Sequence, residues 1–330
     1  MDKLIDITFL DNWIPARVSW QGGSPLIEWC YLGERGFVEP SFNDTVNKCL
    51  EMPFNLLFRH QTTMEILRQR NKVKPGLRPT GFIFHLSRSG ATLLSRMIAA
   101  VPTNIVFSEA RPIDSILRAH SFESSATEAQ RIEWLRLMTS NLAQTRRGDE
   151  RHLFIKFDSW GIFELALIRR AFPDVPWTFV YRDPVEVLTS HSQQRGAHMV
   201  PGVIDPKLLG LEAKTLTDFE PEEYCAKVLQ ALYKAALKYA GDGLLINYSQ
   251  LPEVFSTLSN HFGLTWTNTE METMLSVTAG HAENSAIAVP PASPTKAKRA
   301  SERLRAAALR WAYPAYEALE KARLSKLAHD

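Results

Sequence analysis

A polar turn that follows an apolar run provides groups that bind phosphate. Gly81–Leu86 is largely apolar and leads through Ser87-Arg88-Ser89-Gly90 into a predicted helix. Backbone N–H groups at a tight turn and a helix N-terminus bind phosphate, and the helix dipole favours the negative charge. The Arg88 guanidinium and the Thr92 hydroxyl would add donors. The residues expected to bind phosphate are Arg88, Ser89, Gly90, Ala91 and Thr92.

Two other interpretations of this turn remain open. The spacing is not the Walker A motif, because Gly-x4-Gly-Lys-Ser/Thr is absent. A nucleotide kinase with Asp158 as magnesium ligand is nevertheless an alternative, since Asp158 also follows an apolar run. An ordinary strand, turn and helix with a surface arginine is another. For the chain as a whole, a non-catalytic nucleotide-binding protein is also left open.

A second arginine ends another apolar run. Arg182 follows the predicted strand Trp177–Tyr181, and Pro184 sits where the first turn of a helix tolerates proline. Ser190 comes eight residues after Arg182, on the same predicted helix. Charge-assisted hydrogen bonds from such groups suit a second phosphate. The alternative is an Arg–Asp pair that caps the helix.

Further ionisable side chains follow two more predicted strands. Glu109 and Arg111 come after Asn104–Phe107, and Lys156 lies near the end of His152–Phe157. Site residues of open α/β sheets gather at the carboxyl ends of the strands, so these three are candidates. A structural ion pair between Glu109 and Arg111 is the alternative interpretation.

In this order, the motifs resemble those of sulfotransferases that use 3′-phosphoadenosine 5′-phosphosulfate (PAPS). The loop is similar to the Pro-Arg-Ser-Gly-Thr-Thr-Leu loop of tyrosylprotein and bacterial enzymes, with Ser87 and Ala91 as departures. The family's 3′-phosphate motif has the same separation as Arg182 and Ser190. The resemblance covers roughly residues 80–300 and does not extend to the first 75 or so residues.

The resemblance implies a role for each candidate. Glu109 would be the general base, Arg111 would position the acceptor, and Lys156 with Arg88 would neutralise the leaving group. His120 is a second candidate for the base, and Phe157 departs from the family pattern. The basic residues Lys298 and Arg299 would close over the 3′-phosphate. PAPS would be the co-substrate, with no metal, and the acceptor would be a hydroxyl or amine of a small molecule or peptide.

Apolar runs alternate with helix-like segments after residue 79, which predicts a P-loop-like, three-layer α/β domain with a central parallel sheet. The remaining strands are predicted at Gly81–Leu86 and Leu244–Tyr248. Residues 1–78 are expected to form an N-terminal extension, and residues 79–330 the sulfotransferase-like domain. Helices are predicted at residues 43–51, 60–70, 90–101, 127–146, 161–171, 184–195 and 221–240. Segments 196–220 and 282–300 are candidate lids.

The extension is expected to begin with a β-hairpin. Ala16–Trp20 and Leu26–Leu32 are rich in strand-forming residues, and Gly22-Gly23 between them can supply positive φ.

Composition excludes several classes of partner. A net charge of +2 gives no general attraction to nucleic acid or to an anionic membrane. The three cysteines have neither disulfide-framework nor zinc-site spacing, and the first ten residues do not resemble a signal peptide. We therefore expect a cytoplasmic enzyme, and the sequence leaves a homodimer open.

Overall fold

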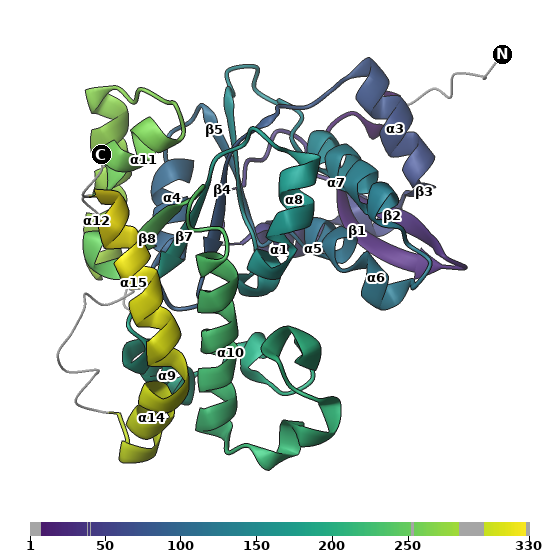
Figure 1. Ribbon diagram of the computed structural model, residues 1–330. Helices are drawn as coiled ribbons and strands as arrows, with labels where there is room; N and C mark the ends of the chain where they lie inside the picture. The colour runs from purple at the N-terminus through teal and green to yellow at the C-terminus, as the bar shows by residue number, and fades with distance from the viewer. Residues whose placement is uncertain (1–7, 38, 40, 252–253, 284–299, 328–330) are drawn as a thin grey trace. The chain divides into compact units, whose positions relative to one another are not determined.

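Five apolar segments form a central parallel sheet flanked by helices. The computed structural model describes residues 8–37, 39, 41–251, 254–283 and 300–327 (Figure 1). The strand order is β5-β6-β4-β7-β8, and the strands are almost wholly buried, as parallel strands covered on both faces must be. They span Pro79–His85 (β4), Asn104–Ser108 (β5), His152–Lys156 (β6), Trp177–Tyr181 (β7) and Leu244–Asn247 (β8). The predicted α/β fold is confirmed.

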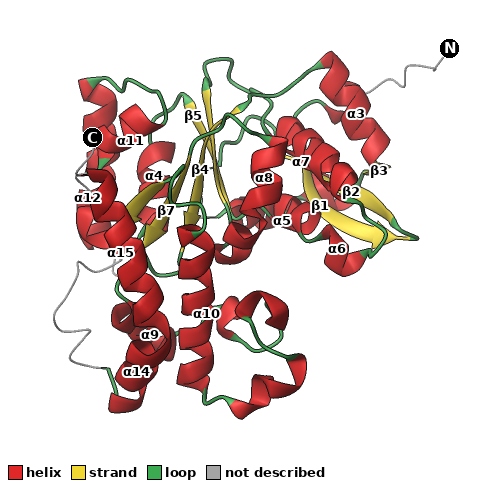
Figure 2. Cartoon of the chain, in the orientation of Figure 1, coloured by secondary structure: helices red, strands yellow, loops and turns green. Residues whose placement is uncertain are grey.

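The predicted N-terminal hairpin is also present, as part of a smaller antiparallel sheet (Figure 2). Strands β1 (Trp13–Gln21) and β2 (Ser24–Tyr31) are joined by Gly22 and Gly23, whose φ values are +55° and +81°. Glycine adopts such values without the steric cost that other residues incur, so the tight turn can form.

One predicted helix was wrong in its first residues. Gln61–Thr63 forms strand β3, which pairs with β2, and helix α3 begins only at Met64 (Met64–Val73). The two β-branched threonines favour extended backbone, and the Trp29 Nε1–H donates a hydrogen bond to Thr62 Oγ1 at 2.8 Å. Pairing with β2 therefore overrides the helical pattern.

The chain divides into two compact units. Unit 1 contains Met1–Phe82, Ile98–Asp158 and Glu164–Val175, and unit 2 contains Ile83–Met97, Ser159–Phe163 and Pro176–Asp330. The predicted boundary between residues 78 and 79 stays a prediction.

Two helices of unit 1 begin with a side-chain cap. The Ser41 hydroxyl accepts a hydrogen bond from Asp44 N at the start of α1, and Thr127 and Gln130 form a capping box at the start of α7. Besides α3, the α-helices of unit 1 are α1 (Phe42–Leu50), α2 (Pro53–Leu57), α5 (Arg111–Leu117), α6 (Ala119–Phe122), α7 (Glu128–Leu142) and α8 (Leu165–Ala171). The predicted helix 161–171 instead begins as the 3-10 helix η2 (Ser159–Glu164).

In unit 2, helix α10 packs along the C-terminal helices, as Figure 1 shows. The helices are α4 (Ala91–Ala99), α9 (Pro184–Gln193), α10 (Pro221–Leu237), α11 (Phe255–His261), α12 (Asn268–Glu283), α14 (Glu302–Ala307) and α15 (Tyr313–Leu327). The last two residues of α4 belong to unit 1. The π-helix η7 (Ala308–Ala312) joins α14 to α15. Segment 196–220 contains the 3-10 helices η3 (Ala197–Met199), η4 (Pro206–Leu209) and η5 (Ala213–Asp218).

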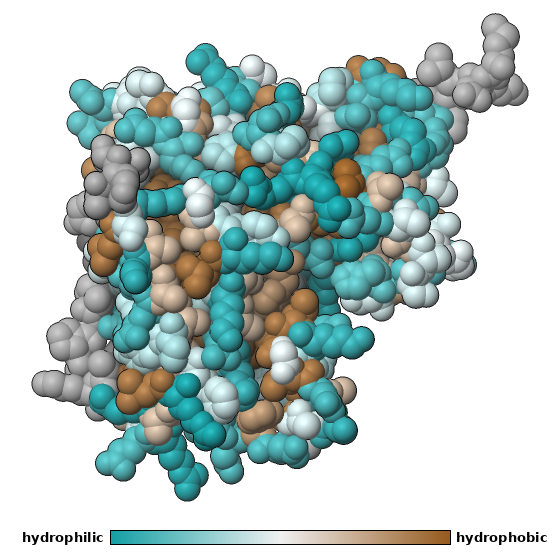
Figure 3. Space-filling view, viewed as in Figure 1, coloured by the Kyte–Doolittle hydropathy of each residue, from teal (hydrophilic) through white to brown (hydrophobic). Residues whose placement is uncertain are grey.

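Hydrophilic side chains cover most of the face seen in Figure 3, between small apolar areas. Within the described residues, no helix is both long and apolar enough to span a bilayer.

Candidate functional site

The loop after β4 is held in an unusual backbone conformation. Arg88 and Gly90 have φ values of +67° and +89°. A side chain at positive φ is strained, and such strain is found mainly where function requires it. Leu86 N donates to Val180 O at 2.9 Å, and the Ser89 hydroxyl lies 2.9 Å from the same carbonyl oxygen and 2.5 Å from Leu86 O. Ser89 therefore fixes the loop to β7, instead of offering its hydroxyl to a ligand.

Glycine is the only residue type that fits at position 90. A Cβ atom there would lie 2.7 Å from the Tyr248 ring, which follows β8. The close approach leaves no room for a side chain, so the loop backbone packs directly on the ring. Helix α4 then begins at the buried Ala91 and the half-buried Thr92.

Arg182 reaches the same tyrosine from the end of β7. Its guanidinium carbon lies 4.0 Å from the centroid of the Tyr248 ring, and its Nε pairs with Glu186. The side chain is 4% exposed, and within the described part of the chain its Nη2 has no hydrogen-bond partner. A buried donor without a partner is costly, roughly 1–3 kcal/mol, so a ligand acceptor at Nη2 would be strongly favoured.

Helix α9 carries Ser190 and has a firmly held start. Asp183 accepts hydrogen bonds from the N–H groups of Val185 and Glu186, and Tyr313 of α15 donates to its second oxygen at 2.5 Å. Ser190 is half-buried, and its hydroxyl makes no hydrogen bond to another described residue. Of the alternative interpretation, an Arg–Asp pair that caps the helix, only the cap is present: Asp183 caps α9, whereas Arg182 pairs with Glu186.

The loop and Arg182 thus meet at one aromatic ring within unit 2. The sequence placed Tyr248 at the end of the predicted strand Leu244–Tyr248 but did not name it as a site residue, although the carboxyl ends of parallel strands are where such residues gather. It also missed Gln194, whose side-chain and backbone oxygens accept hydrogen bonds from Arg88 Nη2 at 2.9 and 3.3 Å. No sequence pattern marks a contact of this kind.

In unit 1, Glu109 pairs with Lys156. Lys156 Nζ lies 2.5 Å from Glu109 Oε1, and the lysine is 2% exposed whereas the Glu109 side chain is 33% exposed. Glu109 has φ +56°, its N–H donates to Lys156 O at 2.8 Å, and Asn43 Nδ2 donates to its carbonyl at 3.0 Å. The geometry therefore combines a reachable carboxylate with a buried ammonium group.

Arg111, His120 and Asp158 are the other candidates of unit 1. Arg111 is the first residue of α5 and is exposed, and the structure records no ion pair between it and Glu109. His120 is exposed on α6. Burial, with the nearby carboxylates of Asp114 and Glu109, raises the pKa of Asp158 well above its usual value. Lys298 and Arg299 fall outside the described residues.

A histidine pair adjoins the Arg88 loop. The rings of His191 and His198 are 5.3 Å apart, and Gly196 N donates to His191 Nδ1 at 3.2 Å. Burial, followed by the charges of His198, Arg88 and Arg195, lowers the pKa of His191 to about 3. His191 is therefore neutral at physiological pH, and the hydrogen bond at Nδ1 assigns its proton to Nε2.

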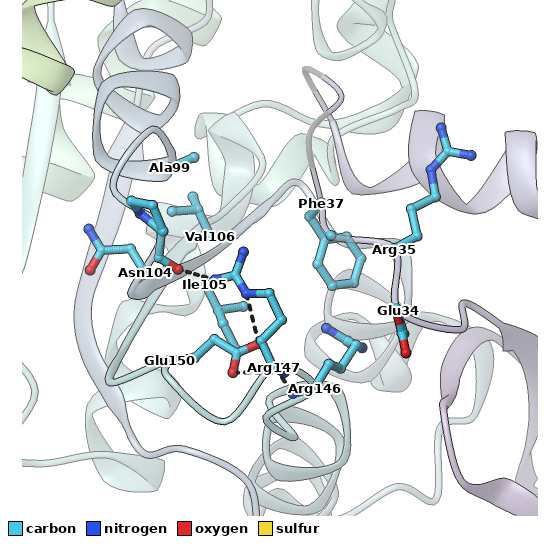
Figure 4. Close-up of a pocket in the computed structure, with 12 residues that line it drawn as sticks. Glu34, Arg35, Phe37, Ala99, Asn104, Ile105, Val106, Arg146, Arg147 and Glu150 are labelled. Atoms are coloured by element: carbon cyan, nitrogen blue, oxygen red, sulfur yellow. Dashed lines mark hydrogen bonds and ion pairs between the residues drawn. The ribbon is translucent and has the colours of Figure 1, made fainter.

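A small cavity of about 80 Å³ lies elsewhere in unit 1 (Figure 4). Arg146 stacks over Phe37 at 5.0 Å, and burial lowers the pKa of its guanidinium to about 10. Glu150 accepts hydrogen bonds from three backbone N–H groups that include those of Arg146 and Arg147. The cavity borders the first residues of β5, whereas sites in open α/β sheets lie beyond the carboxyl ends of the strands. None of the predicted site residues lines it.

Metal ligands do not cluster in the described segments. Across these segments, no group of three or more His, Cys, Asp or Glu side chains could hold a metal ion.

Several solved structures that resemble this chain are bacterial sulfotransferases. The sulfotransferase domain of the Synechococcus PCC 7002 olefin synthase is 17% identical, with a TM-score of 0.44 over 72% of this chain and 94% of that one. A Mycobacterium avium sulfotransferase is 10% identical, with a TM-score of 0.42 over 65% of this chain and 71% of that one. An Alicyclobacillus acidocaldarius sulfotransferase is 17% identical, with a TM-score of 0.38 over 69% of this chain and 99% of that one. No protein-family model and no curated protein matches the chain. We infer the function from the chain's own residues.

The buried neutral His191 predicts a specific dependence of stability on pH. Its pKa in the folded protein lies below its usual value of 6.5, so the unfolded chain takes up the proton first as the pH falls. The neutral ring therefore makes its full contribution to the free energy of unfolding above pH 6.5, and this contribution is lost as the pH falls. Between pH 6.5 and 5.0 the loss from this group should be about 1–2 kcal/mol.

Denaturant unfolding at several pH values in that range measures this loss. His191→Gln should be less stable than the wild type at pH 6.5 but should show a flatter decline in stability toward pH 5.0. His120→Gln, which removes an exposed histidine, is the matched control and should decline like the wild type. A wild-type slope in His191→Gln would show that the ring does not titrate in this way.

Proposed function

We propose that the protein is a sulfotransferase that uses PAPS and transfers its sulfuryl group to a hydroxyl or amine of a small molecule or peptide. The observation that carries the proposal is that the Arg88 loop and Arg182 meet at Tyr248, with a buried donor of Arg182 left without a partner among the described residues. A ligand with two separate phosphate-like groups would satisfy both elements.

PAPS has the required charge distribution. Backbone N–H groups of the loop and the N-terminus of α4, with Arg88 and Thr92, would bind the 5′-phosphosulfate. Arg182 Nη2 and the Ser190 hydroxyl would bind the 3′-phosphate, the group that distinguishes PAPS from ATP. The ring-stacked, ion-paired Arg182 is held in one orientation, so less conformational entropy would be lost on binding.

The proposed reaction is an in-line displacement at sulfur. Glu109 takes the proton of the acceptor O–H or N–H as the acceptor atom bonds to sulfur, and the bond from sulfur to the bridging phosphate oxygen breaks. Adenosine 3′,5′-bisphosphate leaves with the electron pair of that bond. Protonation of Glu109 ends its ion pair, so the Lys156 ammonium becomes able to neutralise the leaving phosphate, together with Arg88. Arg111 would orient the acceptor.

Replacing Arg182 tests the proposed 3′-phosphate contact. Arg182→Ala should weaken binding of adenosine 3′,5′-bisphosphate by about 2–3 kcal/mol, the scale of a charge-assisted hydrogen bond, and should barely affect AMP. Isothermal titration calorimetry with both nucleotides measures the difference. Arg303→Ala, which removes an exposed arginine of α14, should bind both like the wild type. An equal loss for the two nucleotides in Arg182→Ala would refute the assignment.

Removing the proposed base should affect chemistry and not donor affinity. Glu109→Gln should lower turnover by about 10²-fold or more, because the amide has almost the same volume but cannot accept the proton. Release of adenosine 3′,5′-bisphosphate from PAPS, measured with the best acceptor from a panel of phenols, alcohols and amines, reports the rate. Glu317→Gln changes an exposed carboxylate of α15 and should leave it unchanged. Turnover close to wild type in Glu109→Gln would assign the base elsewhere, with His120 next in line.

A further inference from the structure

A short segment of unit 1 exposes an unusual amount of apolar surface. Residues 52–58, here called the apolar lip, contain helix α2 and five large apolar side chains that are 44–78% exposed. They are Met52, Phe54, Leu56, Leu57 and Phe58. Large apolar residues scattered singly on a surface are ordinary, whereas a cluster of this kind marks a binding surface.

The apolar lip is held rigidly against the hairpin sheet. The Phe54 ring lies 4.7 Å from the Tyr31 ring and 4.9 Å from the Phe58 ring, measured between centroids. Asn55 is 3% exposed, accepts a hydrogen bond from Tyr31 N at 2.7 Å and donates to Tyr31 O and Cys49 O, each at 2.9 Å. Because its backbone is anchored by these contacts, the exposed apolar surface is pre-formed.

A cavity of about 340 Å³ adjoins the lip. Its wall includes the buried Ala16 and Trp29, and Asn55 of the lip also lines it. This volume is within the range of small-molecule sites, which combine an apolar wall with a few polar groups. The cavity therefore adjoins the lip through Asn55, and Arg59 of its wall directly follows the last residue of the lip.

The charged groups of this cavity are predominantly cationic. Arg17, Arg59 and Glu28 line it, and no ion pair or hydrogen bond of these three side chains is recorded within the described residues. Two guanidinium groups outweigh one carboxylate, and guanidinium forks bind carboxylate or phosphate in a bidentate way. The cavity is thus suited to an anionic group.

We propose that this cavity and the apolar lip bind a single-chain amphiphile with an anionic head group. The head group would lie between Arg17 and Arg59, and the hydrocarbon chain would cover the lip. Because the cations line a concave cavity, they fit one head group better than the flatter surface of a bilayer or of a second protein. The site is independent of the proposed sulfuryl transfer, since no residue of the two overlaps.

Calorimetry on the full chain tests the proposal with decanoate, kept below its micelle-forming concentration. Saturable binding of one decanoate per chain is expected. Three other ligands should each bind at least about tenfold more weakly than decanoate. Decan-1-ol lacks the negative charge, decyltrimethylammonium carries a positive charge instead, and acetate lacks the hydrocarbon chain.

Variants separate the contribution of the decanoate head group from that of its hydrocarbon chain. Arg17→Gln/Arg59→Gln should weaken decanoate about tenfold or more, and Leu57→Ser, at the most exposed position of the lip, should weaken it several-fold. Arg78→Gln, another exposed arginine of unit 1, should have no effect. The substituted side chains are exposed, so circular dichroism should show unchanged folding.

Three results would overturn the proposal. The first is wild-type affinity in the double arginine variant, or equal affinity for decyltrimethylammonium. The second is binding to phosphatidylglycerol vesicles with none to decanoate, which would make the lip a membrane-docking surface. The third is a dimer, seen by sedimentation, that requires the apolar lip and does not bind decanoate. That result would assign the lip to a second copy of the protein.

Discussion

The ring of Tyr248 sets the geometry of the candidate donor site. It limits residue 90 to glycine, because any Cβ atom would meet the ring, and it supports the guanidinium of Arg182 from one face. A cation–π contact of this kind contributes about 0.5–2 kcal/mol and restricts the arginine to one orientation. Burial raises the pKa of Tyr248, so the phenol stays neutral beside the cation. One side chain thus fixes both the close packing of the loop and the direction of the arginine.

The site keeps groups that are unfavourable when nothing is bound. Arg88 has positive φ, and Arg182 has a buried Nη2 without a partner among the described residues. Each costs about 1–3 kcal/mol, and a phosphate ligand would offset the second by accepting the hydrogen bond. These features are typical of a binding site whose polar groups are oriented before the ligand arrives.

Local sequence patterns were sufficient for the parallel sheet but not for side-chain partners. Strand β7 was predicted to the residue, because its five aromatic and β-branched residues lie between clear boundaries. An ion pair with Arg111 was the alternative interpretation for Glu109, whereas the carboxylate pairs with Lys156. That pair depends on the alignment of β5 with β6, in which Ser108 lies opposite Lys156, and strand order cannot be obtained from local patterns. The contacts of Tyr248 and the packing of the apolar lip also join segments that are distant in the sequence, so local patterns could not predict them.

The proposed site implies that the protein recognises a nucleotide by its 3′-phosphate. Parallel calorimetric titrations of the wild-type protein with adenosine 3′,5′-bisphosphate, AMP and ATP, at the same ionic strength, test it most directly. Adenosine 3′,5′-bisphosphate should bind at least about tenfold more tightly than AMP or ATP, because only its 3′-phosphate offers an acceptor to Arg182 and Ser190. Equal affinity for the three nucleotides, or a preference for ATP, would contradict it.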